Sequence, residues 1–421
     1  MHRESCRVTK NGISVYDYKN PSLHSFFISL FVRSGSMQES LPGITHFLEH
    51  VAIRNVGAVM GGELYSTLDR LGMEFNASTY SEMVQFYITG ASANFDTAAE
   101  IIARLLSPII LPPEEIRTEC ERIKAEIRES DDRTSLTCFS NGIVHQGNSL
   151  SRSITGTLGS VSKITLRKLE EFRREVMRSG NIFFYVSGSY TDEQLLSLCS
   201  QIEKYSVKEG GRNMNVAPVA PDFCKREKHV HLKNADFTML RFSFDMDMSK
   251  MTMAETDLIY DMLLGGYNSR FFIEMSEKRG MFYDISGSSE RYSNIGNLVF
   301  SFEVRSGNVY DAARTAIELL REFKTRLPYE DEMMKAGYVT NAYLLYDEPR
   351  ELNFTFAYDN HVMSQGYQTV QERAEKYASI TPERIREVAG LILRPENLVL
   401  TLKGSKKKID TEMLENIVTE L

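Results

Sequence analysis

Residues 43–51 of this 421-residue chain read Gly-Ile-Thr-His-Phe-Leu-Glu-His-Val and place two histidines and a glutamate within five consecutive positions. On an α-helix His46 and His50 lie one turn apart, and Glu49 falls within the same arc of about 100°. Two imidazoles at that spacing can bind one zinc ion, and the carboxylate between them can reach a water molecule on the metal. The alternative is a pair of satisfied histidines on a half-buried helix, and the pentapeptide alone leaves both interpretations open.

A zinc site needs a third protein ligand, and residues 112–127 offer candidates. Two prolines followed by Glu114 and Glu115 are typical of a helix start. Glu119 and Glu126 are seven residues apart, so they share one helical face beside an apolar stripe. A carboxylate next to a buried face is costly unless it is paired or binds a metal. Spacing alone does not separate a metal ligand from a glutamate at the border of a solvated face.

Taken together, these segments resemble the pitrilysin-type (M16) zinc metallopeptidases, and in particular the short bacterial members similar to mitochondrial processing peptidase. That family combines His-x-x-Glu-His with a distal glutamate, and here 75 residues separate His50 from Glu126. Four further segments resemble family motifs in the same order along the chain: Phe75–Glu82, Ile154–Ser160, Gly265–Phe271 and Glu277–Tyr283.

The resemblance implies a set of metal-site roles. His46, His50 and Glu126 would bind Zn²⁺, and Glu49 would act as general base on the zinc-bound water. Glu119 would be a carboxylate behind the ligands that hydrogen-bonds toward the site and orients them.

The resemblance also implies how a peptide substrate would be held. Asn76, Ala77 and Ser78 would lie on an edge strand whose backbone pairs with an extended peptide. Tyr283 would stabilise the oxyanion that develops at the scissile carbonyl. The implied activity is zinc-dependent endopeptidase cleavage of extended peptides or unstructured protein segments.

Position 276 departs from the family pattern. Complete members carry an arginine seven residues before the tyrosine, whereas this chain has Ser276, whose hydroxyl cannot replace a guanidinium. A non-identical homologous subunit could supply that arginine in a heterodimer, which we favour, or the enzyme works without it. Two further alternatives are a non-catalytic structural or regulatory subunit and a peptide-maturation peptidase that is active only with a partner.

An internal repeat predicts the architecture independently of the family. Residues 70–78 align with residues 278–286, and in each half we expect a helix, a glycine turn, two strands and a long amphipathic helix. This pattern predicts an α+β fold of two homologous halves, each a largely antiparallel sheet with helices packed on one side. A Gly- and Pro-rich linker at residues 207–221 separates a metal-binding catalytic domain (1–215) from a non-metal domain (216–421). The family resemblance implies that the halves form a clamshell.

Charge, hydropathy and cysteine usage argue against nucleic-acid binding and a membrane span, and they indicate a cellular location. A net charge of -8 without a basic stripe argues against nucleic acid. We expect no membrane span, because the apolar run at residues 26–32 is too short to cross a bilayer. Five cysteines without paired spacing, together with a polar N-terminus, favour a cytoplasmic protein with reduced thiols.

Overall fold

The computed structural model describes residues 3–130, 135–211, 236–292, 294–326, 330–405 and 409–421, apart from the side chains of 330–334. The chain folds into two compact units, each assembled from three stretches of sequence. Unit 1 comprises Met1–Asp131, Arg152–Val216 and Ala342–Glu372, and unit 2 comprises Asp132–Ser151, Ala217–Asn341 and Arg373–Leu421. The predicted domain limit at 215/216 and most of the predicted linker lie outside the described residues, so that limit stays a prediction.

Unit 1 contains a six-stranded sheet in the order β1-β2-β6-β3-β5-β4. Adjacent strands of this sheet pair antiparallel, except that β2 and β6 pair parallel. One of the two central strands, β3, carries buried apolar side chains on both faces. Phe26, Ile28 and Leu30 point to one face, and Phe27 and Phe31 point to the other. The strands are β1 (Ser5–Val8), β2 (Ser14–Lys19), β3 (Ser25–Val32), β4 (Glu74–Thr79), β5 (Val84–Ala91) and β6 (Ile182–Gly188).

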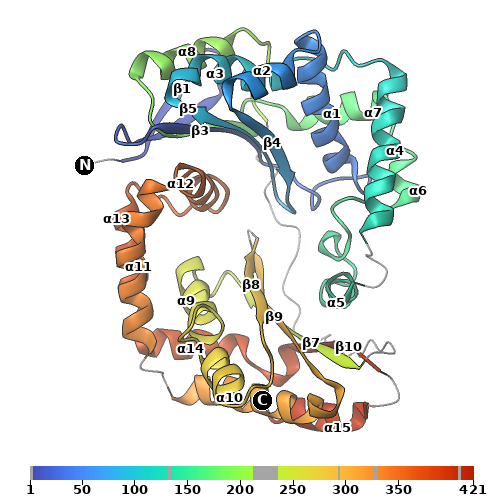
Figure 1. Ribbon diagram of the computed structural model, residues 1–421, viewed down its shortest axis with the longest axis vertical. Helices are drawn as coiled ribbons and strands as arrows, with labels where there is room; N and C mark the ends of the chain where they lie inside the picture. The colour runs from blue at the N-terminus through green and yellow to red at the C-terminus, as the bar shows by residue number, and fades with distance from the viewer. Residues whose placement is uncertain (1–2, 131–134, 212–235, 293, 327–329, 406–408) are drawn as a thin grey trace. The chain divides into compact units, whose positions relative to one another are not determined.

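Helices of unit 1 lie on both faces of this sheet (Figure 1). One face meets most of them across the main core, and the other is covered by α12 (Pro349–Phe356). The buried Asn353 of α12 fixes this contact, since its amide donates to the backbone oxygens of Phe27 (3.2 Å) and Tyr185 (3.0 Å). The other helices are α1 (Ile44–Val59), α2 (Leu64–Leu71), α3 (Phe95–Ala103), α4 (Pro113–Glu129), α6 (Leu158–Val161), α7 (Leu166–Val176) and α8 (Asp192–Glu203).

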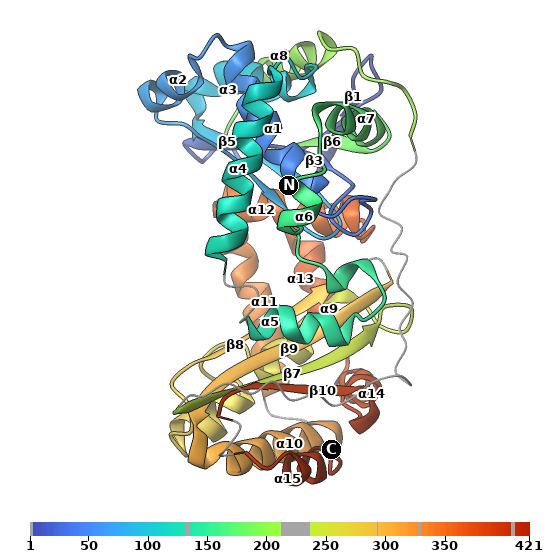
Figure 2. The ribbon, with the colours of Figure 1, turned by 90° about the vertical axis from the view of Figure 1, so that its right-hand side faces the viewer.

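Unit 2 repeats this plan around a four-stranded antiparallel sheet in the order β10-β7-β9-β8. The core face packs against several helices, and α5 (Leu136–Val144) lies on the opposite face (Figure 2). The strands are β7 (Phe237–Asp247), β8 (Ile285–Arg291), β9 (Ile295–Arg305) and β10 (Leu398–Lys403). The remaining helices of the chain are α9 (Met253–Leu263), α10 (Val309–Thr325), α11 (Glu330–Asp347), α13 (Val370–Ala378), α14 (Pro382–Ile392) and α15 (Thr411–Val418), with π-helical segments at Phe272–Glu277 and Ala357–Val362.

The predicted α+β class with two largely antiparallel sheets is confirmed, and the structure adds two details. One pair of strands in unit 1 is parallel. In addition, helices also contact the second face of each sheet: α12 and the π-helical segment Ala357–Val362 in unit 1, and α5 in unit 2. Within the described ranges, no helix combines the length and hydropathy that crossing a membrane requires.

Candidate metal centre

Helix α1 carries the His-x-x-Glu-His segment, and a carboxylate fixes the start of this helix. The first backbone N–H groups of a helix lack intrahelical partners. Here the carboxylate of Glu39 accepts hydrogen bonds from the N–H groups of Gly43 (2.7 Å) and Thr45 (3.1 Å). Glu39 is buried, and burial raises its pKa to about 7 against the opposing effect of these donors. This cap sets where the first histidine of the motif points.

A pair of glycines brings a second segment against the same helix start. Gly43 adopts a left-handed φ of 88°, and a Cβ on it would lie 2.6 Å from the Thr155 oxygen. Gly156 has a φ of 75°, and a Cβ there would lie 2.6 Å from the Pro42 oxygen. Only glycine allows this backbone conformation and close approach together. The motif at residues 154–160 therefore supports the metal helix by direct packing.

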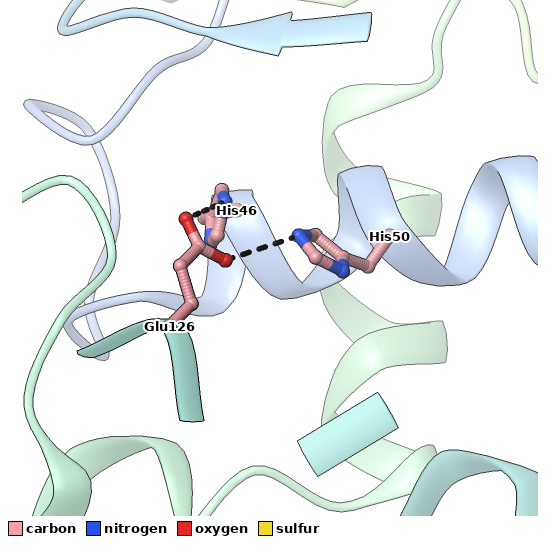
Figure 3. A group of neighbouring side chains, drawn as sticks. All are labelled: His46, His50 and Glu126. Carbon is pink, nitrogen blue, oxygen red and sulfur yellow. Dashed lines mark ion pairs between the residues drawn. The ribbon is translucent and has the colours of Figure 1, made fainter. Parts of the chain in front are cut away.

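Three side chains of α1 and α4 converge on one point (Figure 3). Glu126 of α4 lies between the two imidazoles, 3.6 Å from His46 Nε2 and 3.6 Å from His50 Nε2. One ligand atom from each residue lies within 4.8 Å of the others, and this is the one such group of potential metal ligands among the described residues. The structure thus brings together the three residues that the sequence predicts as ligands.

These residues fit a zinc ion. Donor atoms bound tetrahedrally at the usual zinc distances would be roughly 3.3 Å apart. Glu126 lies 3.6 Å from each imidazole, close to that separation. Burial, with a contribution from His50, lowers the pKa of His46 to about 4, so its imidazole is neutral and able to donate a lone pair at pH 7. Its buried Nδ1 has no hydrogen-bond partner among the described residues, which leaves the ring free to be oriented by a ligand on Nε2.

Glu119 lies behind the ligands and is almost completely buried, with 3% of its side chain exposed. Its Oε2 lies 3.5 Å from His50 Nδ1, the nitrogen that faces away from Glu126. Its Oε1 forms ion pairs with Arg54 (2.9 Å) and Arg122 (3.0 Å). Two arginines therefore hold this carboxylate in place, and the carboxylate orients the His50 ring so that Nε2 faces Glu126.

Glu49 lies on α1 with its side chain toward strand β4. The hydroxyl of Thr79, the last residue of β4, donates a hydrogen bond to Glu49 Oε2. Burial raises the pKa of Glu49 above its ordinary value, and Glu126 adds to this while Thr79 and His50 oppose it. A raised pKa brings a carboxylate closer to the range in which it both takes up and releases a proton.

The predicted substrate segment lies on the open edge of the sheet. Strand β4, which contains Asn76, Ala77 and Ser78, pairs with β5 alone. The N–H of Ala77 donates to the Asn76 side chain (2.8 Å), so this strand keeps a backbone donor outside the ladder. Thr79 at the end of this strand donates a hydrogen bond to Glu49, so the edge strand lies next to the candidate metal centre.

Tyr283 and Ser276 belong to unit 2. The Tyr283 side chain is 97% exposed and free to contact a ligand. Ser276 lies in the π-helical segment, and its hydroxyl donates to the backbone oxygen of Phe282 (3.1 Å). This hydroxyl fixes the backbone immediately before Tyr283. The predicted role of Tyr283 stays a prediction.

Three residues that build the site were missed by the sequence analysis: Glu39, Arg54 and Thr79. Arg54 carries a sequence signal, since it lies one turn after His50 on the same helical face. Thr79 lies within the family-like segment Phe75–Glu82, but its contact with Glu49 depends on the position of β4. Glu39 gives no signal, because it caps the helix through a loop.

Comparison with protein families agrees with this geometry. Residues 15–158 match the family model described as Insulinase (Peptidase family M16), and residues 163–336 match the Peptidase M16 inactive domain. The chain belongs to peptidase family M16. In this M16 chain, His46, His50 and Glu126 lie in the range matched by the first model.

Relatives of this M16 chain carry names that refer to zinc. It is 26% identical over 392 residues to a Rickettsia felis protein named "uncharacterized zinc protease", with 90% of this chain and 89% of the relative covered. A protease from Helicobacter pylori has the same fold, with a TM-score of 0.83 and 16% identity; the match covers 96% of this chain and 100% of the Helicobacter chain. A chain of complex III2 from Candida albicans also shares this fold, with a TM-score of 0.79 and 14% identity; the match covers 98% of this chain and 99% of the Candida chain.

Proposed function

We propose that this chain is a zinc-dependent endopeptidase that cleaves extended peptides or unstructured protein segments. The observation that carries the proposal is the convergence of His46, His50 and Glu126 beside a buried Glu49. A structural subunit of the same fold has no need for two histidines, a distal carboxylate and a buried glutamate in one place. The complete set therefore favours catalysis over the alternative of a non-catalytic subunit.

The residues would divide the chemistry as follows. His46, His50 and Glu126 would hold the zinc ion, which supplies a Lewis acid and lowers the pKa of water toward neutrality when bound. Glu49 takes a proton from the attacking water and later delivers it to the leaving amine. The Thr79 hydroxyl holds the Glu49 carboxylate in one orientation during both transfers. Glu119 keeps the His50 ring in place.

The substrate would bind as an additional strand on β4. Main-chain hydrogen bonds to Asn76, Ala77 and Ser78 give affinity without a sequence requirement. Such pairing needs an extended segment, so peptides and flexible termini are suitable substrates, whereas compact proteins are not. Tyr283 would stabilise the oxyanion.

A peptidase that works only with a homologous partner is the second candidate, and Ser276 favours it. Its hydroxyl is engaged with the Phe282 carbonyl, so it offers no charged donor to a substrate. A non-identical homologous partner would supply the arginine within a heterodimer. We also propose that this protein acts in the cytoplasm.

The test is the metal content of the purified chain together with its cleavage of a quenched peptide library. About one zinc ion per chain and chelator-sensitive cleavage are expected for a self-sufficient peptidase. Zinc without cleavage would point to the partner-dependent enzyme. A chain that binds no zinc would overturn the proposal in favour of the structural subunit.

A further inference from the structure

Strand β7 of unit 2 carries a buried arginine, Arg241, on the face opposite the hydrophobic core. Leu240, Phe242 and Phe244 of the same strand belong to that core. Because side chains alternate along a strand, Arg241 and Ser243 point to the other face. Arg241 is only 9% exposed, so nearly all of this permanently charged side chain is removed from water.

The guanidinium of Arg241 has no hydrogen-bond or ion-pair partner within the described ranges, and its buried Nε is unsatisfied. Two partly buried arginines of unit 1 do have partners. Arg33 Nε donates to the His361 oxygen (2.9 Å), and Arg173 Nη2 donates to the oxygens of Leu106 (2.6 Å) and Ser107 (2.5 Å). Burial lowers the pKa of Arg241, as expected for a cation without a close counter-charge.

Hydroxyl groups flank Arg241 on the neighbouring strands. Arg241 pairs with Thr401 of β10 on one side and with Ser301 of β9 on the other, and Ser301 pairs in turn with Ser286 of β8. Thr401 is completely buried, and its Oγ1 has no partner in the described structure. The face thus holds an unpaired cation beside an unpaired hydroxyl.

Two acidic groups on this face, Asp245 and Glu290, have other hydrogen-bond partners, and a third, Glu303, is exposed two residues beyond Ser301 on β9. Asp245 accepts a hydrogen bond from the Asn297 amide (3.1 Å). Glu290 attracts Arg241 electrostatically, but its carboxylate oxygens accept hydrogen bonds from Ser288 (3.3 Å) and Tyr292 (3.0 Å). Cys138 of α5 is the other titratable neighbour of Arg241. None of these groups forms an ion pair with the guanidinium.

We propose that Arg241, with the hydroxyls of Thr401 and Ser301 beside it, binds a carboxylate of the peptide substrate. A guanidinium offers a planar pair of donors that matches the two oxygens of a carboxylate. An uncompensated buried charge is unfavourable, and a bound carboxylate would remove that cost. The identification of the ligand as a peptide rests on the proposed function, whereas the anion site rests on unit 2 alone.

The carboxylate could come from the C-terminus of the peptide or from an acidic side chain. Three fluorescent peptides of one sequence distinguish these sources: a free acid without acidic residues, its C-terminal amide, and the amide with one glutamate added. Binding is measured by anisotropy to the zinc-loaded Glu49→Gln protein, so that cleavage plays no part. Repeating the measurement after zinc removal separates this site from the metal centre.

We expect one carboxylate-bearing peptide to bind the Glu49→Gln protein about tenfold to a hundredfold more tightly than the plain amide. Adding Arg241→Gln should abolish that difference, whereas Arg305→Gln, an exposed arginine on β9, should preserve it. The comparison of acid with amide needs no Arg241 variant, so a folding defect cannot hide the answer. Equal binding of all three peptides by the Glu49→Gln protein would overturn the proposal, even if the enzyme cleaves peptides.

Discussion

Replacing Glu119 by glutamine should weaken zinc binding although Glu119 is not a ligand. In the structure its carboxylate connects His50 Nδ1 at 3.5 Å with Arg54 at 2.9 Å and Arg122 at 3.0 Å. A glutamine keeps the shape of the side chain but removes its charge, so the His50 ring loses its charged acceptor and both arginines lose a counter-ion. Loss of such a partner typically weakens metal affinity by about 10- to 100-fold. This range corresponds to roughly 1.4–2.8 kcal/mol.

The assay is competition for zinc with a chromophoric chelator at pH 7. Glu121→Gln is the matched control, because Glu121 lies on the same helix, is exposed and pairs with Lys124 (2.7 Å). That control should bind zinc as the wild type does. An affinity for Glu119→Gln within about threefold of the wild type would refute the argument, since a freely rotating His50 would then serve equally well.

Three further predictions concern the supports of the site and its substrate edge. Burial raises the pKa of Glu39 to about 7 from 4.5, so the folded state holds this proton more tightly than the unfolded state and stability falls as pH rises through that window. Between pH 5 and pH 7.5 the free energy of unfolding should fall by roughly 2.4 kcal/mol, and Glu39→Gln should remove this fall in denaturant titrations at the two pH values; an equal fall in both proteins would contradict the assignment. Gly156→Ala should destabilise the protein by at least about 2 kcal/mol, because it combines a left-handed φ with a Cβ 2.6 Å from a backbone oxygen. Gly159→Ala, whose Cβ meets no atom closer than 3.9 Å, should leave the melting temperature nearly unchanged, and similar melting of both variants would count against the packing argument. Ala77→Pro removes a backbone donor from an edge strand that tolerates proline, so kcat/KM should fall roughly threefold to tenfold while stability is retained; unchanged kinetics would exclude strand pairing at this residue.

The grouping of His46, His50 and Glu126 was predictable because its geometry is local. His46 and His50 are neighbours on any helix, and Glu126 needs only a second helix that packs beside the first. The residues that hold Glu49 and the start of α1 in place, Thr79 and Glu39, were not predictable in the same way. Thr79 reaches Glu49 only because the end of β4 approaches α1, and Glu39 caps α1 only through the turn made by Gly43.

The helices on the second faces of the sheets show the same limit. The apolar run at residues 26–32 indicates a strand buried on both faces, but nothing in it identifies the covering helix. Asn353 lies more than three hundred residues away in sequence, and its hydrogen bonds to β3 and β6 depend on tertiary placement. Arg241 is a similar case, since an arginine in a strand is ordinarily exposed and only the packed sheet shows that it is buried without a partner.

The central claim is that His46, His50 and Glu126 bind zinc for a reaction in which Glu49 transfers the proton. The most direct test is the Glu49→Gln variant, with zinc content and peptide cleavage measured on the same preparation, alongside any partner that the wild type requires. The account predicts about one zinc ion per chain and a loss of cleavage of at least about a hundredfold. Near-normal turnover by a zinc-loaded Glu49→Gln protein would contradict it.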